Sequence, residues 1–164
     1  MRYYIIKTQT LFLKSMRIFD WREKINPDWL CLSELYRIPK RIVLPVEIKE
    51  YIPYPDMITE PVLMVSELVY KVIKMYGEMV YTRDVILTDH KSCENKRYYL
   101  VVFENTENKQ WPIQECNIFF RNLNGIRTLF ASIDLVESIL RRGAVGLHLD
   151  KIDLGWKEDC HNVG

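Results

Sequence analysis

Histidine and cysteine are the residue types whose spacing says most about chemistry, because both ligate metals and cysteine can act as a nucleophile. The chain holds three histidines and four cysteines among 164 residues. His90 precedes Cys93 by three positions in a polar loop, and Cys160 adjoins His161 in the tail. Neither pair forms a CxxC or HExxH motif, and no second pair completes a four-ligand zinc set. We therefore expect no metal site and an unreactive loop thiol at Cys93.

Motifs for phosphate binding and for nucleophilic catalysis are also missing from the sequence. Only six glycines occur, and none belongs to a GxGxxG, Walker or GxSxG pattern. The adjacent acids Glu158 and Asp159 stand in a polar stretch, which is typical of a solvated surface. We expect no enzymatic activity, no catalytic residue and no cofactor. One alternative stays open, because residues that meet only in space leave no motif. It is an enzyme or small-ligand-binding protein whose site, assembled from scattered residues, includes His90, Glu94 and the hairpin.

Charge and hydropathy exclude several classes of partner. A net charge of +1, from 23 basic and 22 acidic residues, gives no electrostatic reason to expect a nucleic acid or an anionic membrane. No apolar run approaches the roughly 18 residues that span a bilayer, and "MRYYIIKTQTLFLK" is interrupted before a signal-peptide core can form. We expect a cytoplasmic protein with free thiols and with neither nucleic-acid nor membrane partners. The length suits a single domain, 1–164.

A repeated pattern indicates the elements that would position any site. "VSELVYKVIKMYG" begins at Val65, and "ASIDLVESILRRG" begins 66 positions later at Ala131. In each copy a serine, Ser66 or Ser132, can cap a helix, apolar residues follow at helical spacing, and a glycine can close the helix. The apolar stripes are Leu68, Val69, Val72, Ile73 and Tyr76 in the first copy and Leu135, Val136, Ile139 and Leu140 in the second.

Strands are predicted on both sides of each helix, at 61–65 and 79–87 around the first and at 126–131 and 144–154 around the second. Helices of about ten residues are marginal alone. Each must therefore press its stripe against a sheet, and we expect one sheet shared by both. The predicted fold is α+β: a single domain with a mixed or antiparallel sheet and two serine-capped helices from duplicated strand–helix–strand units.

The remaining chain divides into strands, loops and one irregular segment. The predicted elements are strands at 2–7 and 97–103, a hairpin within 118–130, polar loops at 88–96 and 104–110, and a flexible tail at 157–164. Residues 8–60 are rich in proline, which excludes a long helix, so we expect an irregular segment with at most one helical turn, near 33–36.

Four aromatic residues are the candidate partner-binding residues. Trp29, Tyr51, Tyr54 and Trp111 stand beside charged or proline residues, outside any regular apolar period. Such side chains either close the edge of a core or anchor a protein interface, where tyrosine and tryptophan concentrate binding energy. The irregular segment that carries three of them is where we expect a binding face.

The order of these pieces resembles a family of bacterial immunity proteins that accompany the toxic C-terminal domains of polymorphic-toxin systems. The sequences that carry the resemblance are "RYYIIK", "PVLMVSELVYKVIK", "YYLVVF", "IFFR" and "LFASIDLVESILRRGAVGLHL", in that order. The resemblance covers nearly the whole chain, but residues 8–56 match weakly, so the toxin-binding surface is unassigned. It implies a small cytoplasmic α+β protein that binds a cognate toxin domain and neutralises it by stoichiometric occlusion. A homodimer, joined through a sheet edge or the aromatic region, is a further interpretation.

Overall fold

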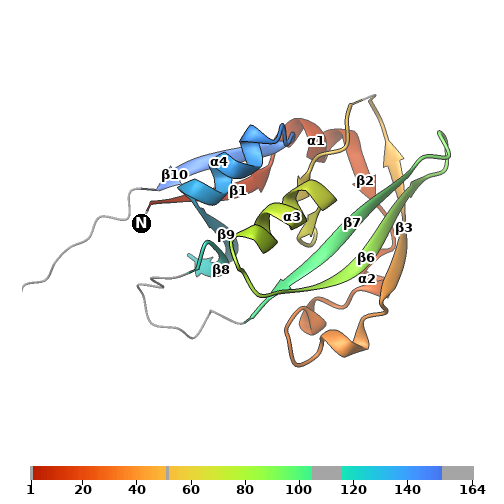
Figure 1. Cartoon of the computed structure of the whole chain (residues 1–164). Helices are drawn as coiled ribbons and strands as arrows, with labels where there is room; N and C mark the ends of the chain where they lie inside the picture. Colours follow the sequence, from red (N-terminus) through yellow and green to blue (C-terminus); the bar gives the residue numbers. More distant parts are fainter. Residues whose placement is uncertain (1, 51, 105–115, 153–164) are drawn as a thin grey trace, which may run out of the picture.

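Two β-sheets and four α-helices make up the part of the chain that the computed structural model describes, residues 2–50, 52–104 and 116–152 (Figure 1). In chain order the elements are β1 (Tyr3–Thr8), α1 (Thr10–Ser15), β2 (Met16–Ile18), α2 (Trp21–Lys24), the 3-10 helices η1 (Pro27–Trp29) and η2 (Leu35–Arg37), β3 (Arg41–Ile48), β4 (Met57–Ile58), β5 (Met64–Val65), α3 (Glu67–Met75), β6 (Val80–Asp89), β7 (Asn95–Phe103), β8 (Ile118–Leu123), β9 (Ile126–Ser132), α4 (Ile133–Arg141) and β10 (Leu147–Ile152). The predicted single-domain α+β class is confirmed.

Both predicted helices begin at their capping serines. The Ser66 hydroxyl accepts a hydrogen bond from the Val69 N–H at 3.5 Å, and the Ser132 hydroxyl accepts one from the Leu135 N–H at 3.3 Å. These bonds satisfy N–H groups that the first turn of a helix leaves without partners. The stripes pack into the core except at one edge, where Leu140 is 44% exposed. The prediction of two serine-capped amphipathic helices is therefore confirmed.

The sheets differ from the expectation in number. One sheet has six strands in the order β2-β3-β6-β7-β5-β4, with β3 and β6 parallel and the other pairs antiparallel. The other has four antiparallel strands in the order β10-β1-β9-β8. Mixed and antiparallel sheets are confirmed, but the single shared sheet is wrong, because the strands before and after each helix belong to a sheet of their own.

Each of the two helices lies in a structural unit, and the two units share the same strand order, with the helix joining equivalent strands. Unit 1 is β4-β5-α3-β6-β7, with its strands in the sheet order β4-β5-β7-β6. Unit 2 is β8-β9-α4-β10 together with β1, in the sheet order β8-β9-β1-β10. In each, the strand after the helix is parallel to the strand before it, with one antiparallel strand between them. That middle strand is β7 or β1, the two strands that share a Tyr-Tyr sequence, so the repeated pattern marks a duplicated structural unit.

The duplication extends to the strand register. Val65 of β5 lies opposite Tyr99 of β7, and Ala131 of β9 lies opposite Tyr4 of β1. Each of these apolar residues directly precedes its capping serine, so the Tyr-Tyr strand aligns with the start of the helix in the same way in both units. Local sequence similarity therefore corresponds to matching three-dimensional pairing.

An Asx residue before each edge strand binds the capping serine, and we call these two contacts the Asx–Ser pairs. Asp56 accepts hydrogen bonds from the Ser66 N–H on its carbonyl oxygen at 2.8 Å and from the Ser66 hydroxyl on its carboxylate at 2.6 Å. Asn117 accepts the same two bonds from Ser132, at 2.7 Å and 2.9 Å. Each serine is thus held from behind while its hydroxyl caps the helix.

The Asx–Ser pairs also connect the units crosswise. Asp56 of unit 1 accepts a bond from the Val145 N–H on its carboxylate at 2.8 Å and donates its own N–H to the Val145 carbonyl at 2.9 Å. Val145 lies in the loop after α4 of unit 2. Conversely, the Asn117 N–H of unit 2 donates to the Glu78 carboxylate, in the loop after α3 of unit 1. Each unit is therefore fixed to the loop that follows the other unit's helix.

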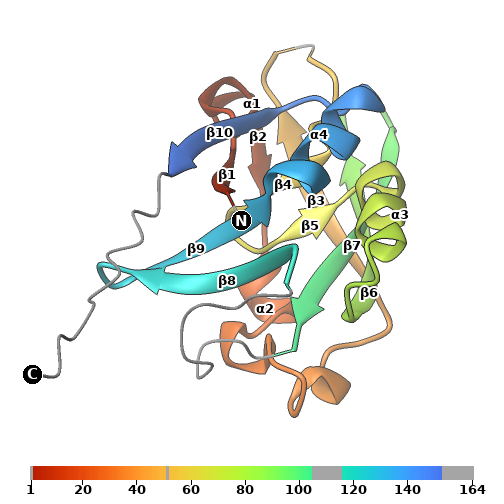
Figure 2. The ribbon, with the colours of Figure 1, turned by 60° about the vertical axis from the view of Figure 1, so that its left-hand side comes forward.

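Two large hydrophobic cores result from this arrangement, together with one small cluster of Tyr3, Ile5, Phe119 and Phe130. The first fills the space between the two helices and the inner faces of both sheets, where Ile6, Ile73 and Ile139 are buried. The helices lie side by side (Figure 2), and the Tyr76 hydroxyl of unit 1 donates to the Asp134 carbonyl at 2.7 Å. The second core lies on the opposite face of the six-stranded sheet, where Leu87 is fully buried.

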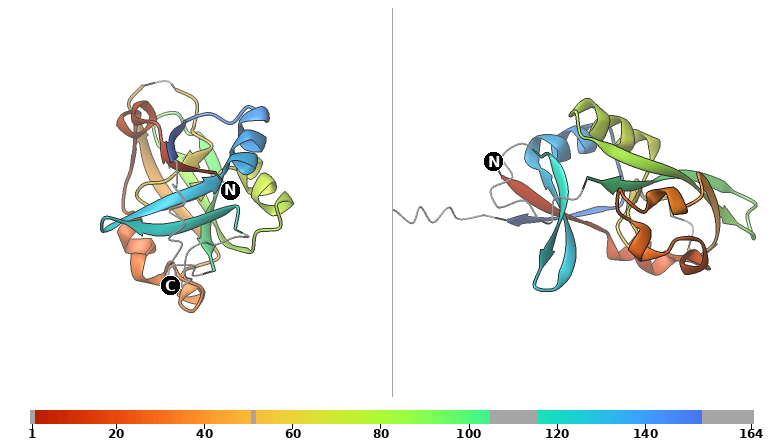
Figure 3. Two further views of the ribbon diagram at one scale, coloured as in Figure 1. Left: turned by 90° about the vertical axis from the view of Figure 1, so that its left-hand side faces the viewer. Right: turned by 90° about the horizontal axis from the view of Figure 1, so that it is seen from below.

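The segment 8–60 forms the cover of the second core, which corrects the expectation of an irregular segment. It contains two short α-helices, two 3-10 helices and the inner strand β3 rather than at most one helical turn. Its own residues Ile25, Leu35 and Ile38 are buried in the second core. The orange part of this segment lies on the side of the six-stranded sheet away from α3 (Figure 3). Proline excludes long helices but is compatible with the first position of η1 and, at Pro45, with the strand β3.

The predicted hairpin within 118–130 is formed by β8 and β9, with its turn at Asn124 and Gly125. Asn124 and Gly125, between β8 and β9, have φ of +51° and +81°, as a two-residue turn of the type favoured in hairpins requires. The turn between β6 and β7 is shorter than the expected loop 88–96, since pairing continues to Thr88 and Asn95. The tail 157–164 and all of the loop 104–110 except Glu104 lie outside the described residues.

The Asx–Ser pairs predict a graded effect on stability. Asp56→Ala removes two hydrogen bonds to a charged acceptor, so we expect a loss of about 3 kcal/mol in the free energy of unfolding. Asn117→Ala removes one neutral side-chain bond, because its bond to Glu78 uses the backbone N–H, and about 1 kcal/mol is expected. Urea unfolding followed by circular dichroism measures both.

Asp134→Ala is the control for these two variants, since Asp134 is an exposed acid in the first turn of α4. It is expected to lose less than about 1 kcal/mol. If Asn117→Ala lowers the free energy of unfolding as much as Asp56→Ala does, or more, then the bond between the Asp56 carboxylate and the Val145 N–H does not add the stability assigned to it.

Candidate functional site

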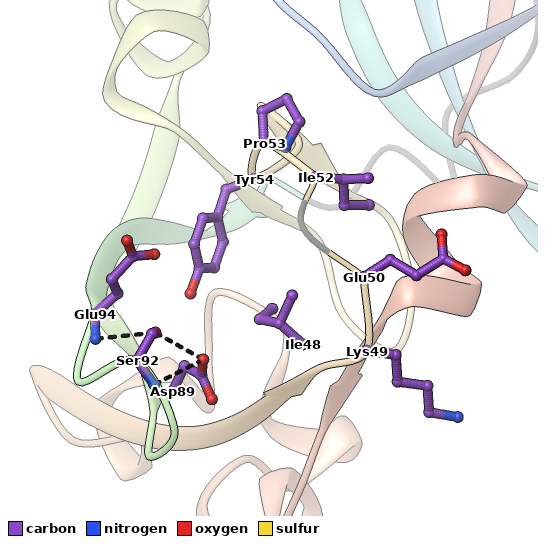
Figure 4. A pocket seen from close by; sticks show the side chains of 9 residues that line it. All are labelled: Ile48, Lys49, Glu50, Ile52, Pro53, Tyr54, Asp89, Ser92 and Glu94. Carbon is purple, nitrogen blue, oxygen red and sulfur yellow. Dashed lines mark hydrogen bonds between the residues drawn. The ribbon is translucent and has the colours of Figure 1, made fainter.

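A cavity of about 410 Å³ lies at the end of β3, where the chain leaves the six-stranded sheet. The loop after β3 supplies one wall and the turn between β6 and β7 supplies the other (Figure 4). Its lining residues are Ile48, Lys49, Glu50, Ile52, Pro53, Tyr54, Asp89, Ser92 and Glu94. The parallel pairing of β3 with β6 brings these two chain segments together, since Val46 lies opposite Asp89.

Asp89 organises the turn wall of the cavity. Its residue is only 4% exposed, and its carboxylate accepts bonds from the Ser92 hydroxyl at 2.7 Å and from the N–H groups of Lys91 and Ser92 at 3.2 and 3.3 Å. The bond from the Ser92 hydroxyl is the main reason that the pKa of Asp89 lies below its usual value. Asp89 is therefore a buried carboxylate held in its ionised form.

The charge of Asp89 has no ion-pair partner among the described residues. The nearby Lys91 ammonium pairs instead with the Glu47 carboxylate, at 3.2 Å. Glu94, which lies on the same wall, forms no ion pair with the described residues either. The turn wall thus presents two carboxylates without an ion pair in the described part of the chain, of which Asp89 is stabilised by hydrogen bonds from its own turn and, more weakly, by the charge of Lys91.

Tyr54 stands between these carboxylates and the opposite wall. Figure 4 shows its hydroxyl directed toward the region between Asp89 and Glu94. The hydroxyl oxygen is buried and has no hydrogen-bond partner among the described residues. Burial, and next the negative charges of Asp89 and Glu94, raise the pKa of Tyr54. A buried hydroxyl without a partner destabilises the fold, so this position is one that packing alone does not explain.

A second feature, the Arg37 cluster, lies on the segment that covers the second core. It consists of Trp29, Glu34, Tyr36 and Arg37. The Arg37 guanidinium carbon lies 5.9 Å from the ring centre of Trp29 and 5.7 Å from that of Tyr36, and its Nε lies 2.7 Å from a Glu34 carboxylate oxygen. Tyr36 is 72% exposed and the adjacent Leu32 is 41% exposed. The cluster is a preformed aromatic surface around an arginine whose charge is paired with Glu34.

Arg83 of β6 holds the backbone beneath this cluster. Its Nη2 donates to the Leu35 carbonyl at 2.8 Å, and its Nε donates to the Ile38 carbonyl at 2.9 Å. Because Leu35 and Ile38 are themselves buried, η2 is fixed both by apolar contacts and by the guanidinium. The exposed Tyr36 is thus carried on a rigid turn.

The structure places the predicted partner-binding residues in different features. Tyr54 lines the cavity, and Trp29 lies in the Arg37 cluster, where it packs against the second core. Tyr51 and Trp111 lie outside the described residues. The sequence criterion, an aromatic residue beside proline or charged residues, therefore found one residue of the cavity, Tyr54, and one of the Arg37 cluster, Trp29. It did not indicate that these two residues belong to separate surfaces.

Sequence reasoning missed Asp89, Ser92, Tyr36 and Arg37. The spacing of Asp89 and Ser92 in a polar stretch is a turn signal that could have been noticed, but their contact with the loop after β3 depends on the tertiary fold. Of the residues in the alternative enzyme hypothesis, Glu94 lines the cavity, whereas His90 is exposed and does not.

The described residues contain neither a metal-ligand cluster nor a membrane-spanning helix. In residues 2–50, 52–104 and 116–152, no three or more His, Cys, Asp or Glu side chains are placed to hold a metal ion together. No helix in this part of the chain is long and apolar enough to cross a membrane.

Comparison with known proteins does not identify the family of this chain. No family model matches it, and no curated protein matches it.

Two tyrosines with buried hydroxyl groups, Tyr54 and Tyr98, allow the unpartnered hydroxyl to be tested. Tyr54→Phe removes a buried group without a partner, so we expect the free energy of unfolding to rise by about 1 kcal/mol. Tyr98→Phe is the matched control, because the Tyr98 hydroxyl donates to the Pro55 carbonyl at 2.7 Å. Its loss is expected to lower stability by about 1–2 kcal/mol. A destabilised Tyr54→Phe variant in urea unfolding would show that the hydroxyl has a stabilising partner.

Proposed function

We propose that this chain is an immunity protein that binds a cognate bacterial toxin domain and neutralises it by stoichiometric occlusion in the cytoplasm. The resemblance on which this rests lies in the scaffold: the Tyr-Tyr strands β1 and β7 and the serine-capped helices α3 and α4 form the duplicated units. The segment that matches the family weakly, 8–56, contains the Arg37 cluster and part of the cavity wall. A common scaffold that carries a variable surface is consistent with inhibitors that each recognise their own toxin.

The Arg37 cluster is the observation that carries the proposal. Tryptophan, tyrosine and arginine are the residue types that dominate binding energy at protein interfaces. Here the three are held together by cation–π contacts and by the Glu34 ion pair. Because the cluster is fixed before binding, little side-chain entropy is lost when a partner covers it. An exposed tyrosine on a rigid turn therefore suits a tight protein contact.

Occlusion needs no chemistry from the inhibitor. An interface of standard size buries about 1,600 Å² in total, which is enough to cover the active site of a small enzyme domain. We expect the outer side of η1 and η2 to form the centre of such an interface, with Leu32 and Tyr36 in contact with the toxin. The inner side of the same segment stays in the second core, so binding requires no rearrangement of the fold.

The proposal predicts a specific loss of binding. Tyr36→Ala is expected to weaken the complex with the toxin domain encoded beside this chain by at least about tenfold, as for truncated interface anchors. The stability of the variant is expected to stay unchanged, because Tyr36 is 72% exposed. Co-expression, gel filtration and isothermal titration calorimetry measure complex formation and affinity, and survival of cells that produce the toxin measures neutralisation.

Ile126→Ala is the matched control, since Ile126 is also a strongly exposed apolar residue, 69% exposed, but lies at the β8–β9 turn. It is expected to bind as the unchanged protein does. If the toxin domain kills cells that make this chain and no complex survives gel filtration, the inhibitor proposal is wrong. If Ile126→Ala rather than Tyr36→Ala weakens the complex, the binding surface is wrong.

A second candidate function is a small-ligand-binding protein or enzyme with a site assembled from scattered residues. The cavity favours it, because residues distant in sequence, Tyr54 and Glu94, converge there with Asp89. Its volume lies within the range of about 300–1,000 Å³ that is usual for ligand sites. Retention of toxin neutralisation by variants of the cavity would separate this function from the first.

A further inference from the structure

The cavity beside Tyr54 is rich in acceptors and poor in donors. Its turn wall offers the carboxylates of Asp89 and Glu94, and the loop after β3 adds the hydroxyl of Tyr54, which can both donate and accept. The one lining residue with a positive charge is Lys49, and Figure 4 shows its side chain directed away from the cavity. A group that complements this wall must therefore donate hydrogen bonds and carry a positive charge.

The buried charge of Asp89 supports the same complement. Carboxylates are rarely this buried without a cation nearby. The described residues give Asp89 three hydrogen bonds from its own turn but no ion pair. The charge of Lys91 lowers the pKa of Asp89, but the Lys91 ammonium itself pairs with Glu47. The Tyr54 hydroxyl is a second, separate observation, since no described residue supplies its partner. A hydrogen-bond donor bound between the two walls would supply a partner to both the Asp89 carboxylate and the Tyr54 hydroxyl oxygen.

The opposite wall is largely apolar, because the side chains of Lys49 and Glu50 are directed away from the cavity (Figure 4). Ile48, Ile52 and Pro53 line it, and the ring of Tyr54 closes it toward the carboxylates (Figure 4). Such a surface suits an aliphatic chain, and an aromatic ring next to carboxylates attracts a cation to its face. The two walls together match a charged head on a short alkyl stem.

We propose that this cavity binds an ammonium or guanidinium group carried on an aliphatic stem. The charged head lies between Asp89 and Glu94 against Tyr54, and the stem lies on Ile48 and Ile52. The site does not involve the Arg37 cluster, so it stands or falls separately from toxin binding at that cluster.

Titration with three probes followed by ¹H–¹⁵N NMR tests this site on the full chain. The probes are n-butylguanidinium, n-butylammonium and the neutral N-butylurea, which has nearly the shape of butylguanidinium. Saturable shifts of the Ser92, Cys93 and Glu94 amides are expected with both cations and not with N-butylurea. No saturable shift with either cation, or equal shifts with N-butylurea, would overturn the proposal.

Two exposed glutamates, Glu94 of the cavity lining and Glu137 of α4, provide a matched pair of variants. Glu94→Gln is expected to weaken butylguanidinium binding by about tenfold, because it removes a charged acceptor from the wall. Glu137→Gln removes the same charge from an exposed side chain of α4 that does not line the cavity. It is expected to change the affinity less than about twofold. Equal weakening by the two variants would show attraction to general surface charge and would overturn the site.

The cation can come from a free small molecule or from a basic side chain of another protein, and a blocked arginine tripeptide distinguishes these sources. Acetyl-Gly-Arg-Gly-amide presents the same head and stem on a peptide backbone. Binding as tight as that of butylguanidinium assigns the site to a side chain. Binding of butylguanidinium with exclusion of the tripeptide assigns it to a free amine or guanidine. Both results support the proposed chemistry.

Discussion

The hydrogen bonds between an Asx residue and a capping serine are the constraint on which this fold depends. Asp56 holds Ser66 and Asn117 holds Ser132, and each serine starts a helix. Because the same Asx residues reach across to the loops at Val145 and Glu78, the bonds that begin each helix also join the two units. The first core forms between helices that are already oriented by these contacts, so helix initiation and sheet packing are coupled rather than independent.

The equivalent tyrosines extend this coupling to the middle strands. Tyr98 of β7 donates to the carbonyl of Pro55, and Tyr3, at the same place in β1, donates to the carbonyl of Cys116. In both units the accepting residue directly precedes the Asx residue. A buried tyrosine, an Asx residue and a serine thus form one repeated polar network at the start of each helix. Its members are satisfied by one another, which is the condition for polar groups to be tolerated inside a core.

Local signals explain what the sequence could predict. The caps at Ser66 and Ser132, the closing glycines and the turn at Asn124 and Gly125 act within a few residues, and all were found where predicted. The division into two sheets, the inner strand around Pro45 and the covering role of 8–60 depend on long-range pairing, which leaves no local pattern. The same limit applies to the site. Tyr54 could be selected as an unusual aromatic, but its meeting with Asp89 follows from the parallel pairing of β3 with β6.

The surfaces proposed for binding lie where the two units cease to be equivalent. Unit 1 carries extra strands, β3 and β2, on its β6 side, and the segment that connects these two strands bears the Arg37 cluster. Its strands β6 and β7 are joined by the turn that holds Asp89 and Glu94, whereas their counterparts β10 and β1 stand far apart in chain order. Residues common to both units are occupied in mutual contacts. Partner recognition is therefore expected of the residues that the duplication does not share, because only these can change without disturbing the polar networks that hold the units together.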